Sequence, residues 1–456
     1  MANRQTISFL HDSLRDYFAA EKLQSEGDTA KPYYFLPRFE PVIPLLAGLL
    51  ENADALLHTI LVEPDDIFHS TLLLAGRCIT VVYVQKTPKQ AEILEQLEGL
   101  LDCPYDMIVE KVVQILMDID TAFSDHIMST TLTRAQISCA RKLINLEDDT
   151  VLLKVISLLS EKHVHTEVKS AIIDGLRHET LGNSVCHQLL SLLEEEEIDI
   201  NIRVQIVESF GYRLTNNPRF LTRLLNLISK KDVNPRLRHH IVTSLGSSSK
   251  YDSRIHSQLF ALLSESHIED EIKVNIAKYV DSDGNHLSPS LREKLNYEQM
   301  MDDYEAAMND WEEYKFGERL RLSYNTDWIW AFASRDPEGL AFWLLEQIEE
   351  IVNEEPYWYE SPFCKNSLPF VDTLRAITHY AEDEKPIPPL FKLLKLSEAK
   401  QLEFDFSHLS PEPVYKAIYD IARRVNVRVL NSGALYSLDD FRRDHNKRAS
   451  ENDTGV

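Results

Sequence analysis

A motif that recurs every 34 or 35 residues limits the fold of this chain more than any other feature of its sequence. Its copies contain an aliphatic residue at Val168, Ile202, Leu237 and Ile272. A base directly follows each of these: Lys169, Arg203, Arg238 and Lys273. Three positions before each aliphatic residue stand Asp199, Asn234 and Glu269, with His165 in the first copy. Asp and Asn cap helices because their side chains accept orphan amide protons, so the motif predicts a helix start.

A second apolar stripe accompanies each copy, and it includes Leu189-Leu190, Leu224-Leu225 and Leu259-Phe260. Neither helix can bury its stripe alone, so we expect two antiparallel helices per repeat, stacked on their neighbours. Ser-Phe-Gly at Gly211 and Ser-Leu-Gly at Gly246 predict the points where two of these helices end. The predicted fold is all-α, an α-α superhelix (a HEAT- or armadillo-like solenoid) with a mainly helical C-terminal domain.

The repeats between about residues 133 and 285 resemble HEAT repeats, in which a cap residue, a branched aliphatic residue and an Arg or Lys recur. His165 departs from the acidic or amide cap of that pattern. The resemblance implies a scaffold that binds a protein ligand, although the fold does not name the ligand. We predict that Lys169, Arg203, Arg238 and Lys273 form a partner-binding column. Each base should be partly exposed and close to an acidic or amide side chain.

The N-terminal region carries a second resemblance. The stretch from Phe9 to Leu23 has Phe9, His11, Arg15, Asp16 and the Phe-Ala-Ala that begins at Phe18. It is similar to the segment that follows the nucleotide-binding core of NACHT-type (STAND) signalling NTPases. No GxxxxGK[ST] motif occurs, so these 456 residues contain no P-loop for a triphosphate. The resemblance implies the sensor or autoinhibitory arm of such an NTPase, with an NTPase module encoded upstream as a partner.

Beyond the repeats the composition changes. All five Trp fall between Trp311 and Trp358, and residues 297–384 hold 21 acidic and 6 basic residues. The plain interpretation is a further helical domain with an aromatic core and a solvated acidic face. The functional one is a recognition surface, because aromatic residues are enriched at binding hot spots and an acidic field attracts basic partners. We assign Trp328, Trp330 and Trp358 to that surface as a prediction.

The C-terminal segment contains one clear helix, which is expected to start at Pro411 with Ser410 as its cap. Residues 426–430 read as a short strand followed by a turn at residues 431–433, and a basic tail begins at Arg442. The predicted domains are residues 1–108 (the region resembling the post-NACHT segment), 109–296 (HEAT-like repeats), 297–384 (the acidic Trp-rich domain) and 385–456.

Signals for other classes of function are weak. No GxSxG, HExxH or GxGxxG motif is present, so no catalytic residue or cofactor is predicted. Neighbouring histidines such as His239 and His240 project about 100° apart on a helix and cannot share a metal ion, so no metal site is predicted either. A formal charge of −25 argues against a nucleic-acid partner, and the apolar runs are too short to cross a membrane. The odd, scattered cysteines indicate reduced thiols in a cytoplasmic protein, and they are Cys78, Cys103, Cys139, Cys186 and Cys364.

The predicted function is non-enzymatic binding of a protein ligand. The alternative from another class is an enzyme of the HEAT-like bilin lyase kind, which attaches a chromophore to an antenna protein. The repeats of those enzymes are usually nearer 30 residues and richer in Ala and Gly. A stable coloured complex with a tetrapyrrole would favour this alternative.

Overall fold

The computed structural model describes residues 12–25, 28–82, 87–146, 148–177, 182–214, 218–249, 252–281, 285–296, 326–353, 367–401 and 411–438. Within these ranges the chain is almost entirely helical, and its strands form a single two-stranded hairpin. This confirms the all-α class. The chain divides into two compact units, one formed by Met1–Ser129 with Leu320–Val456 and the other by Thr130–Arg319. The domain boundaries predicted from the sequence remain predictions.

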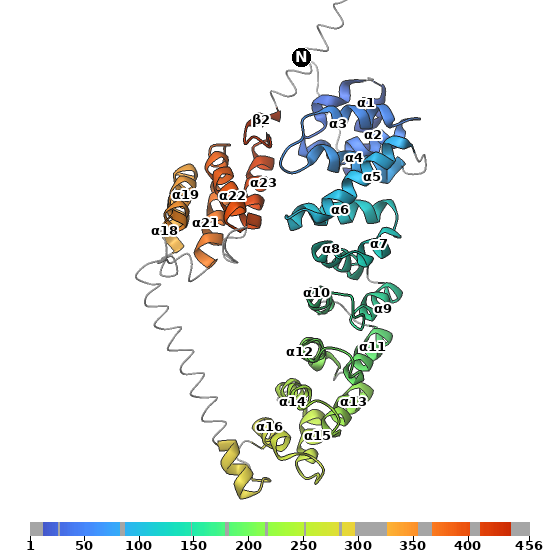
Figure 1. The fold of residues 1–456 in the computed structure, drawn as a ribbon, viewed down its shortest axis with the longest axis vertical. Coiled ribbons are helices and arrows are strands. Elements are labelled where there is room, and N and C mark those ends of the chain that lie inside the picture. The colour runs from blue at the N-terminus through green and yellow to red at the C-terminus, as the bar shows by residue number, and fades with distance from the viewer. Residues whose placement is uncertain are drawn as a thin grey trace, which may run out of the picture. The chain divides into compact units, whose positions relative to one another are not determined.

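Residues 130–319 form the repeat unit, whose helices lie in two layers (Figure 1). In the first layer each helix packs on the next in the order α8, α10, α12, α14 and α16. These helices are α8 (Thr133–Ile144), α10 (Thr166–Leu176), α12 (Ile200–Leu214), α14 (Pro235–Ser249) and α16 (Asp270–Val280). The second layer contains α9 (Asp149–Ser157), α11 (Asn183–Glu194), α13 (Pro218–Ser229) and α15 (Ser253–Leu263).

Caps start the first-layer helices as the motif predicts. His165 Nδ1 accepts the backbone N–H of Glu167, although a His was the poorest match to a cap. Asp199 and Asn234 each accept the N–H two residues further on, at 2.7 and 2.9 Å. Glu269 stands at the fourth cap position but makes no side-chain cap bond. Its carboxylate instead pairs with Arg238 of the preceding repeat.

The helix ends predicted at two glycines are wrong. Helix α12 continues through Gly211 to Leu214, and α14 continues through Gly246 to Ser249. At Gly246 the physical reason is close packing: a Cβ there would lie 2.3 Å from Cγ of Tyr279, on α16. Glycine therefore lets the aromatic ring of the next repeat lie against the helix instead of ending it.

The other unit, which we call the terminal unit, begins with short helices packed around α4. The ranges are α1 (Asp12–Ser25), α2 (Val42–Leu49), α3 (Asp54–Val62), α4 (Ser70–Val82), α5 (Pro88–Gly99), α6 (Asp106–Ile119) and α7 (Phe123–Ser129). Three short 3-10 helices join them, at Asp28–Tyr33, Pro37–Phe39 and Leu100–Asp102. Helix α4 is buried along most of its length because its own sequence is largely apolar and it packs against α2, α3, α5 and α6.

The C-terminal part of the same unit contains α18 (Thr326–Ala333), α19 (Pro337–Asn353), α21 (Ser367–Tyr380), α22 (Ile387–Gln401) and α23 (Pro411–Arg424). Strands β1 (Val427–Val429) and β2 (Leu435–Ser437) pair antiparallel, with Arg428 opposite Tyr436. The helix from Pro411, the strand and the turn predicted in this segment are confirmed. Gly433 in the turn has a φ of 80°, which favours glycine. Ser410 and the tail from Arg442 lie outside the described residues.

A search of the described helices for one both long enough and apolar enough to cross a bilayer finds none.

Candidate functional site

Contacts between successive repeats recur at a spacing of 35 residues. Lys162 pairs with Glu197 at 3.1 Å, and Ser170 Oγ donates to Gln205 Oε1 at 3.0 Å. Arg236 Nη1 donates to Asn201 Oδ1, also at 3.0 Å. All three contacts are exposed or half-buried; two of them join neighbouring first-layer helices, and the third joins the turns that precede α10 and α12. The spacing of 35 residues found in the sequence therefore also separates the two partners of each of these contacts.

In two repeats the base interacts with the cap residue of the next repeat, Lys169 with Asp199 and Arg238 with Glu269. Arg238 Nη2 donates to the Glu269 carboxylate at 2.7 Å, which explains why Glu269 does not cap its own helix. Burial lowers the pKa of the Lys169 ammonium, while the carboxylates of Asp199 and Glu161 act in the opposite direction. The fourth base, Lys273, is half-buried.

Two of the bases are far more buried than the sequence suggested. Only 8% of Arg203 and 2% of Arg238 is exposed, so the expectation of partly exposed side chains is wrong for both. Each base directly follows a buried aliphatic residue at the start of a helix, and packing of the next repeat covers it. The energy of a buried ion pair is not that of a surface pair, because desolvation opposes the attraction.

A small cavity in the repeat unit lies beside Arg203. Its volume is about 310 Å³, and its lining includes Lys230 near the end of α13 and Asn234 at the cap of α14. Glu194, on the same lining, is paired with Arg223 at 2.7 Å. This pairing lowers the pKa of the Glu194 carboxyl. The sequence motif placed Arg203 in the basic column but gave no sign of a cavity.

Of the three tryptophans assigned to the recognition surface, only Trp330 has a side chain that the structure describes. Trp330 on α18 is half-buried and makes edge contacts with the rings of His379 and Tyr380, with centroids 5.7 and 6.1 Å away. Trp328 belongs to the same helix, but its side chain lies outside the described residues, as does the whole of Trp358. Their role in recognition stays a prediction.

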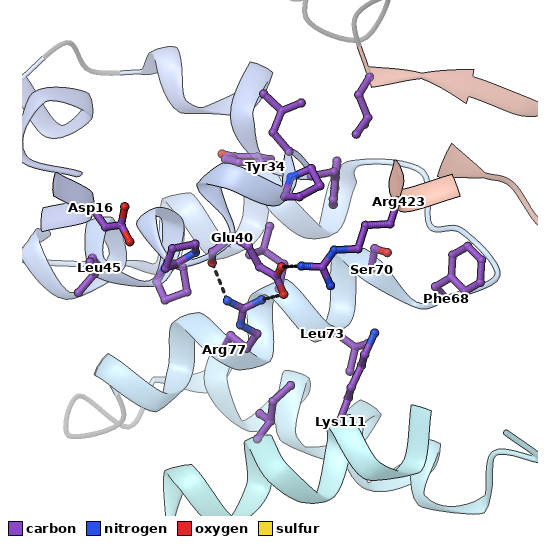
Figure 2. A pocket seen from close by; sticks show the side chains of 18 of the residues that line it. Asp16, Tyr34, Glu40, Leu45, Phe68, Ser70, Leu73, Arg77, Lys111 and Arg423 are labelled. Atoms are coloured by element: carbon purple, nitrogen blue, oxygen red, sulfur yellow. Dashed lines mark hydrogen bonds and ion pairs between the residues drawn. The ribbon is translucent and has the colours of Figure 1, made fainter. Parts of the chain in front are cut away.

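The terminal unit contains a larger cavity, of about 840 Å³, that the sequence did not indicate. Figure 2 shows Arg77 and Arg423 converging on Glu40 from two sides. Their guanidinium nitrogens lie 2.6 and 2.7 Å from its two carboxylate oxygens. Leu14 and Tyr17 of α1 add exposed apolar surface. Glu40 balances the charge of one of these two arginines, so the three side chains together keep one positive charge.

The wall of this cavity is built from both ends of the sequence. Lys111 Nζ, on α6, lies 2.8 Å from Tyr419 Oη, on α23. Arg428 Nε, on β1, donates to Asp66 Oδ2 at 3.2 Å, and both side chains are almost fully buried. Its guanidinium also lies over the ring of Phe35, 3.9 Å from the centroid. No signal of this pair is present in the sequence, because a charged residue between two valines in a strand ordinarily faces solvent on the side opposite the valines.

Among the described residues, no group of His, Cys, Asp and Glu side chains is arranged to hold a metal ion. Comparison of the chain with protein families, with curated proteins and with solved structures finds no match.

Proposed function

We propose that this chain is an α-solenoid of HEAT-like repeats that binds a protein ligand and catalyses no reaction of its own. The observation that carries the proposal is a set of three polar contacts, each of which joins residues 35 positions apart: one between α10 and α12, one between α12 and α14, and one between the turns that precede α10 and α12. A surface on which each repeat presents its side chains in the same register suits an extended protein segment, because successive repeats can contact successive residues of the ligand.

The proposal extends to the kind of assembly. By the resemblance of the Phe9–Leu23 stretch, the chain is the sensor or autoinhibitory arm of a cytoplasmic NACHT-type NTPase, whose nucleotide-binding module is the partner. Residues Asp12 to Leu23 of this stretch belong to α1, whereas Phe9 and His11 lie outside the described residues. The acidic Trp-rich block is a second contact surface in this proposal.

Site-specific photocrosslinking tests the binding surface. A photoreactive residue replaces Asp174, Glu208 or Thr243, which follow one another at the repeat spacing on α10, α12 and α14. The matched controls are Ser184, Asn226 and Ser257, which are exposed on α11, α13 and α15 of the other layer. We expect one discrete crosslinked protein from the first set in the native host. The same product from both sets, or none from the first, would contradict the proposal.

A further inference from the structure

Arg203 is a buried cation that lacks a counter-ion in the part of the chain that the structure describes. It is 8% exposed, and no described carboxylate lies within ion-pair distance of it, whereas Arg238 is paired with Glu269; the Nε of both arginines lacks a hydrogen-bond partner. Removing a charge from water without pairing it is strongly unfavourable. A side chain in this state indicates that something else supplies the negative charge.

The next repeat shows what the missing group is. Arg238 is the equivalent base, and its Nη2 meets the carboxylate of Glu269. The residue equivalent to Glu269 beside Arg203 is Asn234. An amide carries no charge, and Asn234 Oδ1 already accepts the backbone N–H of Arg236 at 2.9 Å. The repeat that contains Arg203 therefore lacks the carboxylate that its neighbour contains.

The space for that carboxylate is present. The cavity of about 310 Å³ beside Arg203 suits a side chain rather than a large cofactor. Lys230 adds a second cation to the lining, but it is exposed, and Glu194 is occupied by Arg223. Glu196 and Asp232 also line the cavity, but both are exposed, so solvent screens their repulsion of an incoming anion. The only deeply buried charge of this lining is positive.

We propose that the Arg203 cavity binds a carboxylate, supplied by an Asp or Glu side chain of the protein ligand. This inference rests on the proposed function for the identity of the ligand, but the carboxylate site itself can be tested without it. The cavity makes Arg203 the specificity-determining contact of the surface, because only an acidic residue of the ligand can neutralise it.

Two variants test whether the charge is unsatisfied in the free protein. Arg203→Met retains the length of the side chain and removes the charge, so the melting temperature of the variant should rise. Asn234→Glu supplies the carboxylate found in the next repeat but loses the cap on α14, so its melting temperature should exceed that of Asn234→Gln, which loses the same cap. Asn234→Gln is the matched control of equal length without charge, and it should give no rise. A fall in melting temperature for Arg203→Met would overturn the proposal, because it would show that the guanidinium is already satisfied.

A small probe tests carboxylate binding directly. N-acetylglutamate α-amide, at constant ionic strength, should slow hydrogen exchange in peptides that cover residues 194–234 of the full chain. Its neutral isostere, N-acetylglutamine α-amide, should not. The effect should be absent in Arg203→Met and in Asn234→Glu. Equal responses to both probes, or a response that survives Arg203→Met, would overturn the site. Protection by inorganic phosphate alone would overturn the assignment to a carboxylate.

Failure of this inference can be distinguished from failure of the proposed function. If the probe gives no protection while photocrosslinking at Glu208 still captures the ligand, the carboxylate site is wrong and the function stands. If the probe protects the cavity but no protein is captured, the site stands as an anion site and its assignment to a protein ligand is overturned. Capture that is lost in Arg203→Met, with the fold intact, supports both.

Discussion

The buried ion pair between Arg428 and Asp66 joins two parts of the terminal unit that lie 362 residues apart in the sequence. The side chains are only 4% and 2% exposed. Asp66 Oδ1 also accepts the backbone N–H groups of Phe68 and Ser70, at 3.1 and 3.0 Å. We therefore choose Arg428→Met, a change that keeps apolar contacts in the strand while it removes the cation.

The cost follows from what the substitution leaves behind. Asp66 would keep its two backbone donors and lose its only described counter-ion, and the stacking of a cation on Phe35 would also be lost. Breaking a buried pair from one side costs about 3–5 kcal/mol. Because the backbone donors still satisfy one carboxylate oxygen, we expect a loss near the lower end, about 3 kcal/mol. The double variant Arg428→Met/Asp66→Asn removes both charges and should recover about 1 kcal/mol or more of that loss.

Urea denaturation followed by tryptophan fluorescence reports on this unit, because Trp328, Trp330, Trp343 and Trp358 all belong to it. The matched control is Arg375→Met, since Arg375 forms a surface pair with Asp372 and its side chain is 68% exposed. The control should change the free energy of unfolding by less than about 0.5 kcal/mol. If Arg428→Met lowers the free energy of unfolding by no more than this control does, the argument that Arg428 and Asp66 form a buried pair whose loss destabilises the unit is refuted.

Four further outcomes are expected. Glu412 accepts two backbone N–H groups at the start of α6, so Glu412→Ala should cost about 1 kcal/mol in urea denaturation, and a neutral result would mean that the cap is not formed. Gly246→Ala should destabilise the repeat unit by about 1–3 kcal/mol, because the new Cβ meets the ring of Tyr279, and the same change made in a Tyr279→Ala background should cost much less. Burial raises the pKa of the Cys78 thiol to about 12. Above about pH 8.5 the unfolded chain therefore releases a proton that the folded unit retains, so stability should fall by up to about 1.4 kcal/mol per pH unit until about pH 12, and less steeply in Cys78→Ala. The chain alone should neither bind nor hydrolyse ATP, and a saturable calorimetric isotherm would contradict this.

The helix starts of the repeat unit could be predicted largely because their information is local. Caps at Asp199 and Asn234, and Pro235 at the first position of α14, act within one helical turn. The error at Gly246 has the opposite origin. A glycine near the end of an apolar stripe resembles a helix terminus, whereas here it provides room for Tyr279, and that ring is 33 residues away in the sequence.

The candidate site was predictable only in part, for the same reason. The spacing identified Arg203 and Arg238 as equivalent, but their burial depends on how the next repeat covers them. The difference between Glu269 and Asn234 is visible in the sequence once the pairing of base and following cap is known. Spacing alone does not show that pairing, because it joins residues of different repeats. The cavity in the terminal unit required contacts between the two ends of the chain, and no local pattern encodes these.

The separation of those ends does not make their association expensive. The entropic cost of closing a loop grows only with the logarithm of its length, so closing about 360 residues instead of about 35 costs about 2 kcal/mol more. The Glu412 cap on α6 offsets part of this cost. The stacked rings of Tyr105 and Tyr415, with centroids 3.8 Å apart, add apolar burial. A few contacts of this kind therefore suffice to keep the two sequence segments of the terminal unit together, although the repeat unit separates them in the sequence. For this reason the loss of Arg428 alone should lower the stability of the whole terminal unit.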